Sequence, residues 1–461
     1  MSPATSESLS YKWIVLLITS VSTFTTTFDS SVVNIALPSI SSSLNMDITT
    51  TAWVQTSYLL AISVPLISAG RLGDLKGRKP IFILGIIIFT LGSVLCGLSN
   101  HRLQILLFRI IQGLGAALSA NAVAILVDAF PEKERGKALG VNTMAVYIGL
   151  TAGPLLGGFL IQSLGWQSIF FVNVPIGIVV VLLSIRWLKR GSTSGGQSFD
   201  LLGAISFSVC LVPFLLSLTF GGTIGWTSIF VIALMVVSMV SFGLFLLIEA
   251  RLTQHPMLEL SLFTKNRLFA AANFTALAYF VSSFSTSFLI SYYLQSVLGF
   301  PPSQTGMILL LMPLTMAMIS PLTGWLSDKF GSRFMSSLGM TTISVILISF
   351  SGLQASSSVQ EILIRLLIAG IGTGIFPSPN SSAVMGSVQK EKLGVASGTL
   401  GTMRSMGQAI SMTVAGTMLG SSTKPVSSFI GAMHNVFILS AVISAIGFFI
   451  SIAQGTRSTR R

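Results

Sequence analysis

The feature of this sequence that most constrains its fold is a succession of long apolar runs. Each run holds about 20 mostly apolar residues, the length that a helix needs to cross a bilayer. We find fourteen, at residues 13–37, 52–70, 80–98, 103–126, 138–162, 167–188, 202–221, 227–248, 268–294, 303–324, 334–353, 361–384, 394–419 and 430–453. The pair 202–221 and 227–248 is split at GGTIGW, because one uninterrupted span of that length would be too long. The sequence therefore predicts an all-α polytopic membrane protein with fourteen transmembrane helices.

Composition supports this reading and excludes several classes of protein. Only 8% of the 461 residues are charged, whereas a soluble domain carries about 25%, and 52% are hydrophobic. A soluble enzyme, a nucleic-acid binder and a disordered scaffold are therefore excluded. The net charge of +13 comes from short basic clusters between the apolar runs. That pattern is typical of membrane topology rather than of a nucleic-acid partner.

The distribution of Lys and Arg orients the chain. With the N-terminus in the cytoplasm, 21 basic residues fall on inner segments, and only Arg102 and Lys424 fall on outer ones. This asymmetry predicts cytoplasmic N- and C-termini and a multi-pass protein of the plasma (cell) membrane. The first apolar run is too long for a signal peptide and lacks a cleavage site, so we expect it to stay as the first helix.

No pattern of catalytic or metal-binding residues is apparent. Cys96 and Cys210 lie inside apolar runs, far apart, and the three histidines are near predicted loops. The sequence has no glycine-rich phosphate loop followed by Lys-Ser/Thr, so we do not expect ATP to drive it directly. We therefore predict that the protein is not an enzyme, has no catalytic residues and binds no metal or cofactor.

The chain contains an internal repeat. The loop Gly70-x-Leu72-x-Asp74-x-x-Gly77-Arg78-Lys79 after the second run returns after the tenth as Gly324-x-Leu326-x-Asp328-x-x-Gly331-x-Arg333, with a constant offset of 254. Two six-helix halves with two extra central helices follow from this repeat. We expect four regions: a cytoplasmic tail at 1–12, a bundle at 13–190, a linker with the extra helices at 191–248, and a second bundle at 249–461 with an interfacial lead-in. Paired bundles are the architecture of alternating-access carriers.

Several motifs resemble those of one known family. The repeated loop is similar to the signature of the major facilitator superfamily. The segments FDSSVVNIALPSI from Phe28, WVQTSYLL from Trp53, GLTAGPLLGG from Gly149, WQSIFFVNVPIG from Trp166 and HPMLELSLF from His255 resemble its fourteen-helix drug:proton antiporter branch. The resemblance implies a proton-coupled transporter that exports drug-like or amphipathic molecules and uses the proton gradient as its energy source. Run 303–324 departs from some polyspecific members because it has no acidic residue, which argues against recognition of divalent cations.

The resemblance also assigns roles to two motifs. The repeated loop is expected to be a gating latch that holds the halves together on the inside, formed by Gly70, Asp74, Gly77, Arg78, Gly324, Asp328 and Arg333. The alternative is a solvated loop that only orients the chain. The antiporter motif comprises Gly149, Gly153, Pro154, Gly157 and Gly158. Its glycines allow close helix packing and its proline a bend, and whether it also seals the protein against proton leak is left open.

Asp29 and Arg109 are the candidates for proton coupling. At 1.5 Å per residue, Asp29 lies ~12 Å and Arg109 ~10 Å below the outer ends of their helices, so the two charges are level in depth. Burial favours a neutral carboxyl group, whereas a nearby arginine favours the carboxylate. This competition could set Asp29 to take up and release a proton. The alternative is a permanent ion pair that fixes the first helix to the fourth.

Candidate substrate-binding residues are aromatic or polar and lie inside the spans. They are Phe28, Asn34, Trp53, Tyr58, Gln112, Tyr279 and Arg404. Arg109, Arg365 and Arg404 outnumber the one deeply placed carboxylate, Asp29, which favours an anionic or electron-rich substrate. The alternative function is therefore proton-coupled transport of one specific anionic metabolite. A channel is disfavoured because no ring of pore-lining charge is apparent. We expect a monomer whose partners are a small-molecule substrate and the lipid bilayer, without nucleic acid.

Overall fold

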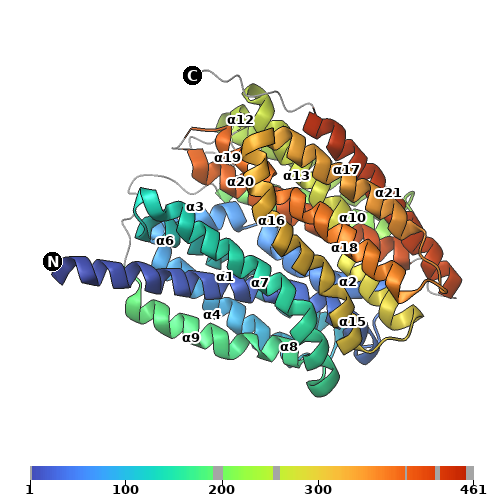
Figure 1. Ribbon diagram of the computed structural model, residues 1–461. Helices are drawn as coiled ribbons and strands as arrows, with labels where there is room; N and C mark the ends of the chain where they lie inside the picture. Colours follow the sequence, from blue (N-terminus) through green and yellow to red (C-terminus); the bar gives the residue numbers. More distant parts are fainter. Residues whose placement is uncertain (1–2, 190–200, 253–259, 390–391, 421–425, 453–461) are drawn as a thin grey trace.

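The structure is a computed structural model that describes residues 3–189, 201–252, 260–389, 392–420 and 426–452. Every element in these ranges is helical, and the helices lie side by side in one bundle (Figure 1). The first turn of α1 and the last turn of α21 lie toward the same end of the bundle as α3, α6 and α12 (Figure 1). The predicted linker at 191–200 and the last nine residues lie outside the described ranges.

The first group of helices covers the first six predicted spans. Its members are α1 (Pro3–Ser43), α2 (Ile48–Ser63), α3 (Leu66–Lys76), α4 (Arg78–Gly97), α5 (Arg102–Ser119), α6 (Ala122–Ala129), α7 (Glu132–Leu164), α8 (Ser168–Phe171) and α9 (Asn173–Trp187). Helix α1 begins at Pro3, so most of the segment expected as a tail is helical. Proline is tolerated in a first helical turn, and nothing before Lys12 breaks the helix. Lys12 is buried and forms an ion pair of 2.5 Å with Glu134 of α7.

The middle and last groups cover the other eight predicted spans. The middle group is α10 (Leu201–Ile224), α11 (Ile229–Leu247), the π-helix η1 (Ile248–Leu252) and α12 (Leu260–Lys265). The last group is α13 (Arg267–Ser283), α14 (Thr286–Tyr292), the π-helix η2 (Tyr293–Val297), α15 (Pro302–Leu309), α16 (Leu311–Phe330), α17 (Ser332–Ser351), α18 (Val359–Ile375), α19 (Pro377–Gly386), α20 (Leu393–Gly420) and α21 (Val426–Ile452).

Several predicted spans are interrupted helices. The second span breaks between α2 and α3 at Pro65, and the twelfth between α18 and α19 before Pro377. A proline lacks the N–H that would continue the hydrogen-bond ladder, so a break at that position is expected. The fourth span breaks at Ala120 and Asn121 without a proline. There the Asn121 side-chain amide donates to the carbonyls of Ala69 and Leu118.

The two groups meet along two equivalent seams. Helix α7 packs on α1 of its own group and on α15 and α16 of the other group. Helix α20, its counterpart in the repeat, packs on α13 of its own group and on α2 and α3 of the other. Helix α10 packs on α20 and on α11, and the indole N–H of Trp53 on α2 donates to Thr219 of α10 at 3.1 Å. The middle group is therefore attached at the seam between α2 and α20.

Eleven helical stretches among the described residues are long and apolar enough to cross a membrane. The predicted spans 13–37, 52–70 and 394–419 are not among them. They lie on α1, on α2 with α3, and on α20, which are rich in Ser, Thr and Gly. The all-helical membrane architecture is established, while the count of fourteen spans and the cytoplasmic location of the termini stay predictions.

Candidate functional site

Asp29 lies in the middle of the first group of helices and is fully buried. Its Oδ2 accepts a hydrogen bond of 2.7 Å from the Arg109 guanidinium. Its Oδ1 accepts from the side-chain amides of Gln112, at 2.9 Å, and Asn173, at 2.8 Å. The carboxylate therefore holds together α1, α5 and α9 with three hydrogen bonds, two of them from neutral amides.

Arg109 is equally buried and uses all parts of its guanidinium group. Besides Asp29, it donates to the Val54 carbonyl at 3.0 Å, the Gln55 Oε1 at 3.0 Å and the Gln112 Oε1 at 2.6 Å. The ring of Tyr58 lies 4.0 Å from the guanidinium carbon, in cation–π geometry. Arg109 therefore links α5 to α2 as well as to α1.

Asp29, Arg109, Gln55, Gln112 and Asn173 form what we call the buried ion-pair network. Charges are costly in a bilayer unless they are paired and hydrogen-bonded, and here both conditions are met. Removing the negative charge by protonating Asp29 would leave the arginine without its counter-charge. The site can thus serve either as a fixed clamp or as a protonation-dependent one, and its geometry is compatible with both interpretations made from the sequence.

Two residues of this network, Gln55 and Asn173, and the neighbouring Ser93 were not singled out from the sequence. Gln55 and Asn173 lie inside the quoted segments WVQTSYLL and WQSIFFVNVPIG, and Ser93 accepts from the Gln112 amide at 2.8 Å. For Gln55 and Asn173 the available signal was a polar amide inside a predicted span. It was insufficient because a sequence does not show which faces of five separate helices meet.

A second cluster of polar and aromatic residues lies at the seam between the groups. Arg404 on α20 has an exposed side chain, with its guanidinium carbon 5.9 Å from the Phe280 ring. It also lies within electrostatic range of Tyr147 on α7 and Tyr279 on α13. The Tyr279 ring stacks on Phe376 at 4.3 Å. We call Arg404, Tyr147, Tyr279, Phe280 and Phe376 the seam cluster.

Two more features define the seam cluster. The Tyr147 hydroxyl forms a hydrogen bond with the hydroxyl of Ser320 on α16, so the cluster draws on both groups of helices. No ion pair involves Arg404 among the described residues. Of the residues expected to bind substrate, the structure brings Tyr279 and Arg404 together here. Tyr147 and Ser320 were not singled out from the sequence, because a hydroxyl in a span gives no signal of its own.

The other candidate binding residues lie elsewhere. Tyr58 and Gln112 belong to the surroundings of the buried ion pair, as described above. Phe28 is buried beside Gly149, and Trp53 contacts α10. Asn34 is buried, its amide N–H₂ lies 3.5 Å from the Ser30 carbonyl, and its side-chain oxygen has no hydrogen-bond partner.

The repeated loop has the same backbone shape in both halves. Gly77 and Gly331, which share the offset of 254, have φ values of 94° and 87°, a region that favours glycine. The Arg78 guanidinium pairs with the Asp128 carboxylate at 2.5 Å and ties α4 to α6. A Cβ added at Gly324 would lie 3.2 Å from the Ser378 hydroxyl, whereas one added at Gly70 would have no neighbour within 4 Å. The side chains of Asp74 and Asp328 are not among those described, so their latch role stays a prediction.

The glycines of the antiporter motif face two different neighbours. A Cβ added at Gly149, Gly153 or Gly157 would come within 2.9 Å of α1. A Cβ at Gly158 would instead lie 2.4 Å from the Pro302 carbonyl oxygen of the last group, and one at Gly306 would lie 2.1 Å from the Pro154 carbonyl oxygen. The motif therefore packs α7 between the two groups, at the end of α7 remote from Glu132.

The structure has two groups of membrane-spanning helices, and equivalent helices of each group, α7 and α20, pack across a polar seam on the other group. This arrangement is typical of a membrane transporter. The chain belongs to the Major Facilitator Superfamily, because the sequence model of that family matches residues 19–264 and 272–459. The resemblance that the motifs indicated is thereby confirmed. The protein is a transporter rather than an enzyme, and a multi-pass protein of the plasma membrane.

Relatives that match most of this chain include transporters of different kinds. The riboflavin transporter RibZ from Clostridioides difficile (strain 630) is 34% identical over 405 residues, covering 87% of this chain and 86% of that protein. The multidrug resistance protein Stp from Mycobacterium tuberculosis (strain ATCC 25618 / H37Rv) is 34% identical over 410 residues, covering 88% and 75%. The tetracenomycin C resistance and export protein from Streptomyces glaucescens is 30% identical over 413 residues, covering 89% and 76%.

Solved structures share the fold at low sequence identity. The xylose transporter XylE from E. coli, in a partially occluded inward open conformation, matches with a TM-score of 0.66 and 12% identity over 95% of this chain and 97% of that one. The human organic anion transporter MFSD10 matches with a TM-score of 0.64 and 16% identity over 98% and 100%. These similarities establish the major facilitator fold and nothing about the substrate.

Proposed function

We propose that this protein is a secondary active transporter that exports drug-like or amphipathic small molecules in exchange for protons, by alternating access. The proposal includes fourteen spans, cytoplasmic termini and a monomer that needs no bound metal or cofactor. Multidrug-resistance and drug-export proteins among the relatives support efflux. The observation that carries proton coupling is the fully buried carboxylate of Asp29 on α1, which accepts hydrogen bonds from α5 and α9 at once.

The buried ion-pair network offers a physical route from protonation to movement. An ionised Asp29 attracts Arg109 strongly, because both side chains are shielded from water. A protonated Asp29 loses that attraction and can accept fewer charge-assisted hydrogen bonds. Protonation would therefore loosen α1 from α5 and α9, and α1 also contacts α14 and α15 of the other group. In this way a proton taken up at Asp29 would alter the contact between the two groups.

Transport by reconstituted vesicles tests this role. The change Asp29→Asn should abolish uphill efflux driven by a pH gradient while it preserves exchange of substrate down its own gradient. Preserved exchange would also show that the variant is folded. The matched control is Asp47→Asn, the same charge change at an exposed position where either residue caps α2. Undiminished uphill transport by Asp29→Asn would refute the assignment.

The second candidate function is transport of one anionic or electron-rich aromatic metabolite. The seam cluster supports it, because an exposed guanidinium lies beside the rings of Tyr279 and Phe280 and makes no ion pair among the described side chains. A riboflavin transporter is as similar to this chain as a multidrug protein is, so similarity alone does not choose between the two functions.

A panel of cationic, neutral and anionic compounds separates these functions. For anionic substrates, Arg404→Gln should raise KM about tenfold or more, the effect of losing a charged hydrogen bond of about 1.5–3 kcal/mol. For cationic drugs the same change should have little effect or lower KM. Efflux confined to one anionic compound would support the second function, and efflux of many cations would support the first.

A further inference from the structure

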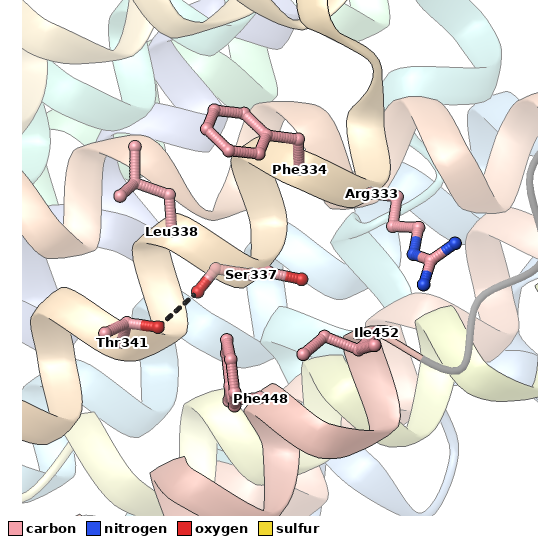
Figure 2. A pocket seen from close by; sticks show the side chains of 7 residues that line it. All are labelled: Arg333, Phe334, Ser337, Leu338, Thr341, Phe448 and Ile452. Atoms are coloured by element: carbon pink, nitrogen blue, oxygen red, sulfur yellow. Dashed lines mark hydrogen bonds between the residues drawn. The ribbon is translucent and has the colours of Figure 1, made fainter.

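A groove runs between α17 and α21 at the end of the bundle where α21 terminates (Figure 2). Its volume is about 340 Å³, within the range of about 300–1,000 Å³ that small-molecule sites occupy. Seven residues line it: Arg333, Phe334, Ser337, Leu338, Thr341, Phe448 and Ile452. Figure 2 shows Arg333 at one end, beside Ile452, with Thr341 at the opposite end.

The body of the groove is suited to a hydrocarbon chain. Phe334, Leu338, Phe448 and Ile452 provide its walls. Its hydroxyl donors are already engaged, because the Ser337 hydroxyl donates to Ser451 at 3.0 Å and the Thr341 hydroxyl donates to the Ser337 carbonyl at 3.0 Å. A ligand that needed hydrogen-bond donors would find no free hydroxyl donor along this stretch. An acyl chain needs none.

The position of the groove gives it access to lipid. Its walls are parts of two stretches that can cross a membrane, Ser332–Ser351 and Ser427–Ile452. Arg333 is the second residue of the first stretch, and Ile452 is the last of the second. Phe334 and Leu338 are exposed, with 57% and 41% of their surfaces accessible. On a membrane-spanning helix such side chains face acyl chains, so the groove opens to the bilayer near its polar boundary.

Arg333 supplies a charge at the boundary end of the groove. None of the described acidic side chains forms an ion pair with it. It lies in the first turn of α17, where backbone N–H groups are not used inside the helix. A guanidinium binds a phosphate with two parallel hydrogen bonds and stays charged at every physiological pH. The groove therefore combines an apolar body with one cationic end, which matches an anionic amphiphile.

We propose that this groove binds one anionic glycerophospholipid. Its phosphate lies on the guanidinium of Arg333, and one acyl chain lies between Phe334 and Leu338 of α17 and Phe448 of α21. None of the residues that line the groove belongs to the buried ion-pair network or to the seam cluster. The inference concerns the lipid bound to α17 and α21 and does not depend on the proposed function.

Native mass spectrometry of the purified full chain tests the phosphate contact. Adducts are counted after titration with phosphatidylglycerol or, for comparison, with zwitterionic phosphatidylcholine. The change Arg333→Gln should lower the apparent affinity for phosphatidylglycerol about fivefold, the equivalent of one basic residue near an anionic lipid surface. The matched control is Lys329→Gln, the same loss of charge at an exposed position outside the groove. It should leave the affinity within about twofold of the wild type.

A second pair of variants tests the acyl-chain contact. The change Thr341→Phe places a ring in the groove and should displace the lipid. The control Val345→Phe adds a ring to an exposed position of α17 that does not line the groove. Thermal unfolding gives an independent readout, since a ligand of the native state raises the unfolding temperature. Phosphatidylglycerol should stabilise the wild type and Val345→Phe, but not Thr341→Phe.

Three results would overturn the proposal. One is equal binding of phosphatidylglycerol by the wild type, Arg333→Gln and Thr341→Phe. Another is equal binding of phosphatidylcholine and phosphatidylglycerol by the wild type, which would mean a groove without preference for charge. The third is full protection by glycerol phosphate alone, which would indicate a site for free phosphate rather than for lipid.

Discussion

At the scale of residues, the proposed proton coupling rests on the Asp29 carboxylate and the Arg109 guanidinium, which form a fully buried ion pair. Their depth and opposite charge could be predicted from the sequence, because both lie a countable distance from a helix end. Their partners Gln55, Gln112 and Asn173 required the structure. Which face of a helix meets which neighbour depends on packing across the bundle, and span positions do not contain that information.

A double-mutant cycle measures how strongly the two charges depend on each other. Arg109→Met should destabilise the protein by about 3–5 kcal/mol, because it leaves a buried carboxylate without a counter-charge. Adding Asp29→Asn should restore part of that loss, since no buried charge then remains. Unfolding in mixed detergent micelles gives the four free energies. Strictly additive effects would mean that the two side chains are not coupled.

At the scale of elements, the glycines of α7 clearly predicted close helix packing, but they did not indicate every helix that α7 contacts. Their spacing predicts close helix packing, and the structure shows it for Gly149, Gly153 and Gly157 against α1. The contact of Gly158 with α15 lies between two segments more than a hundred residues apart. The interruption of the fourth predicted span was missed for a similar reason, because the Asn121 amide also donates to the Ala69 carbonyl of α3, which only tertiary packing brings near.

Two glycine-to-alanine substitutions on α7 separate the effect of lost close packing from the effect of replacing a glycine in the helix. Gly158→Ala places a methyl group 2.4 Å from the Pro302 carbonyl oxygen, a distance that the backbones must increase. We expect it to hold the two groups apart at this end and to reduce the transport rate at least tenfold. The control is Gly140→Ala on the same helix, which has open space around the added carbon. Its transport should match the wild type, and a similar loss in both variants would contradict the role of the contact.

At the scale of the whole molecule, the repeat predicts two halves and the charge asymmetry predicts their orientation in the membrane. The similar backbone angles at Gly77 and Gly331 and the matching positions of α7 and α20 follow the repeat. The middle group has no counterpart in the repeat. Its attachment to α2 through Trp53 and to α20 could not be predicted, because α10 has no charged residue and no motif to indicate its neighbours.

The topology of the middle group is what the count of fourteen spans depends on. Four predicted spans separate Lys189 from Lys329, namely α10, α11, α13 with α14, and α15 with α16. If all four cross the membrane, the two lysines lie on the same side, whereas a single re-entrant helix in the middle group would place them on opposite sides. Cys96 and Cys210 are free thiols, so both should first be replaced by serine to leave a single cysteine in each variant.

Single cysteines placed at four exposed positions then give the answer. An impermeant thiol reagent applied outside intact cells should label Arg102→Cys and Ser356→Cys, which follow an odd number of spans. Lys189→Cys and Lys329→Cys should react only after the membrane is opened, because each follows an even number. Labelling of Lys329→Cys but not Lys189→Cys from outside would reduce the count to thirteen spans. It would also reverse every later loop, so that the basic residues of the last group would face outward against the charge asymmetry that orients membrane proteins.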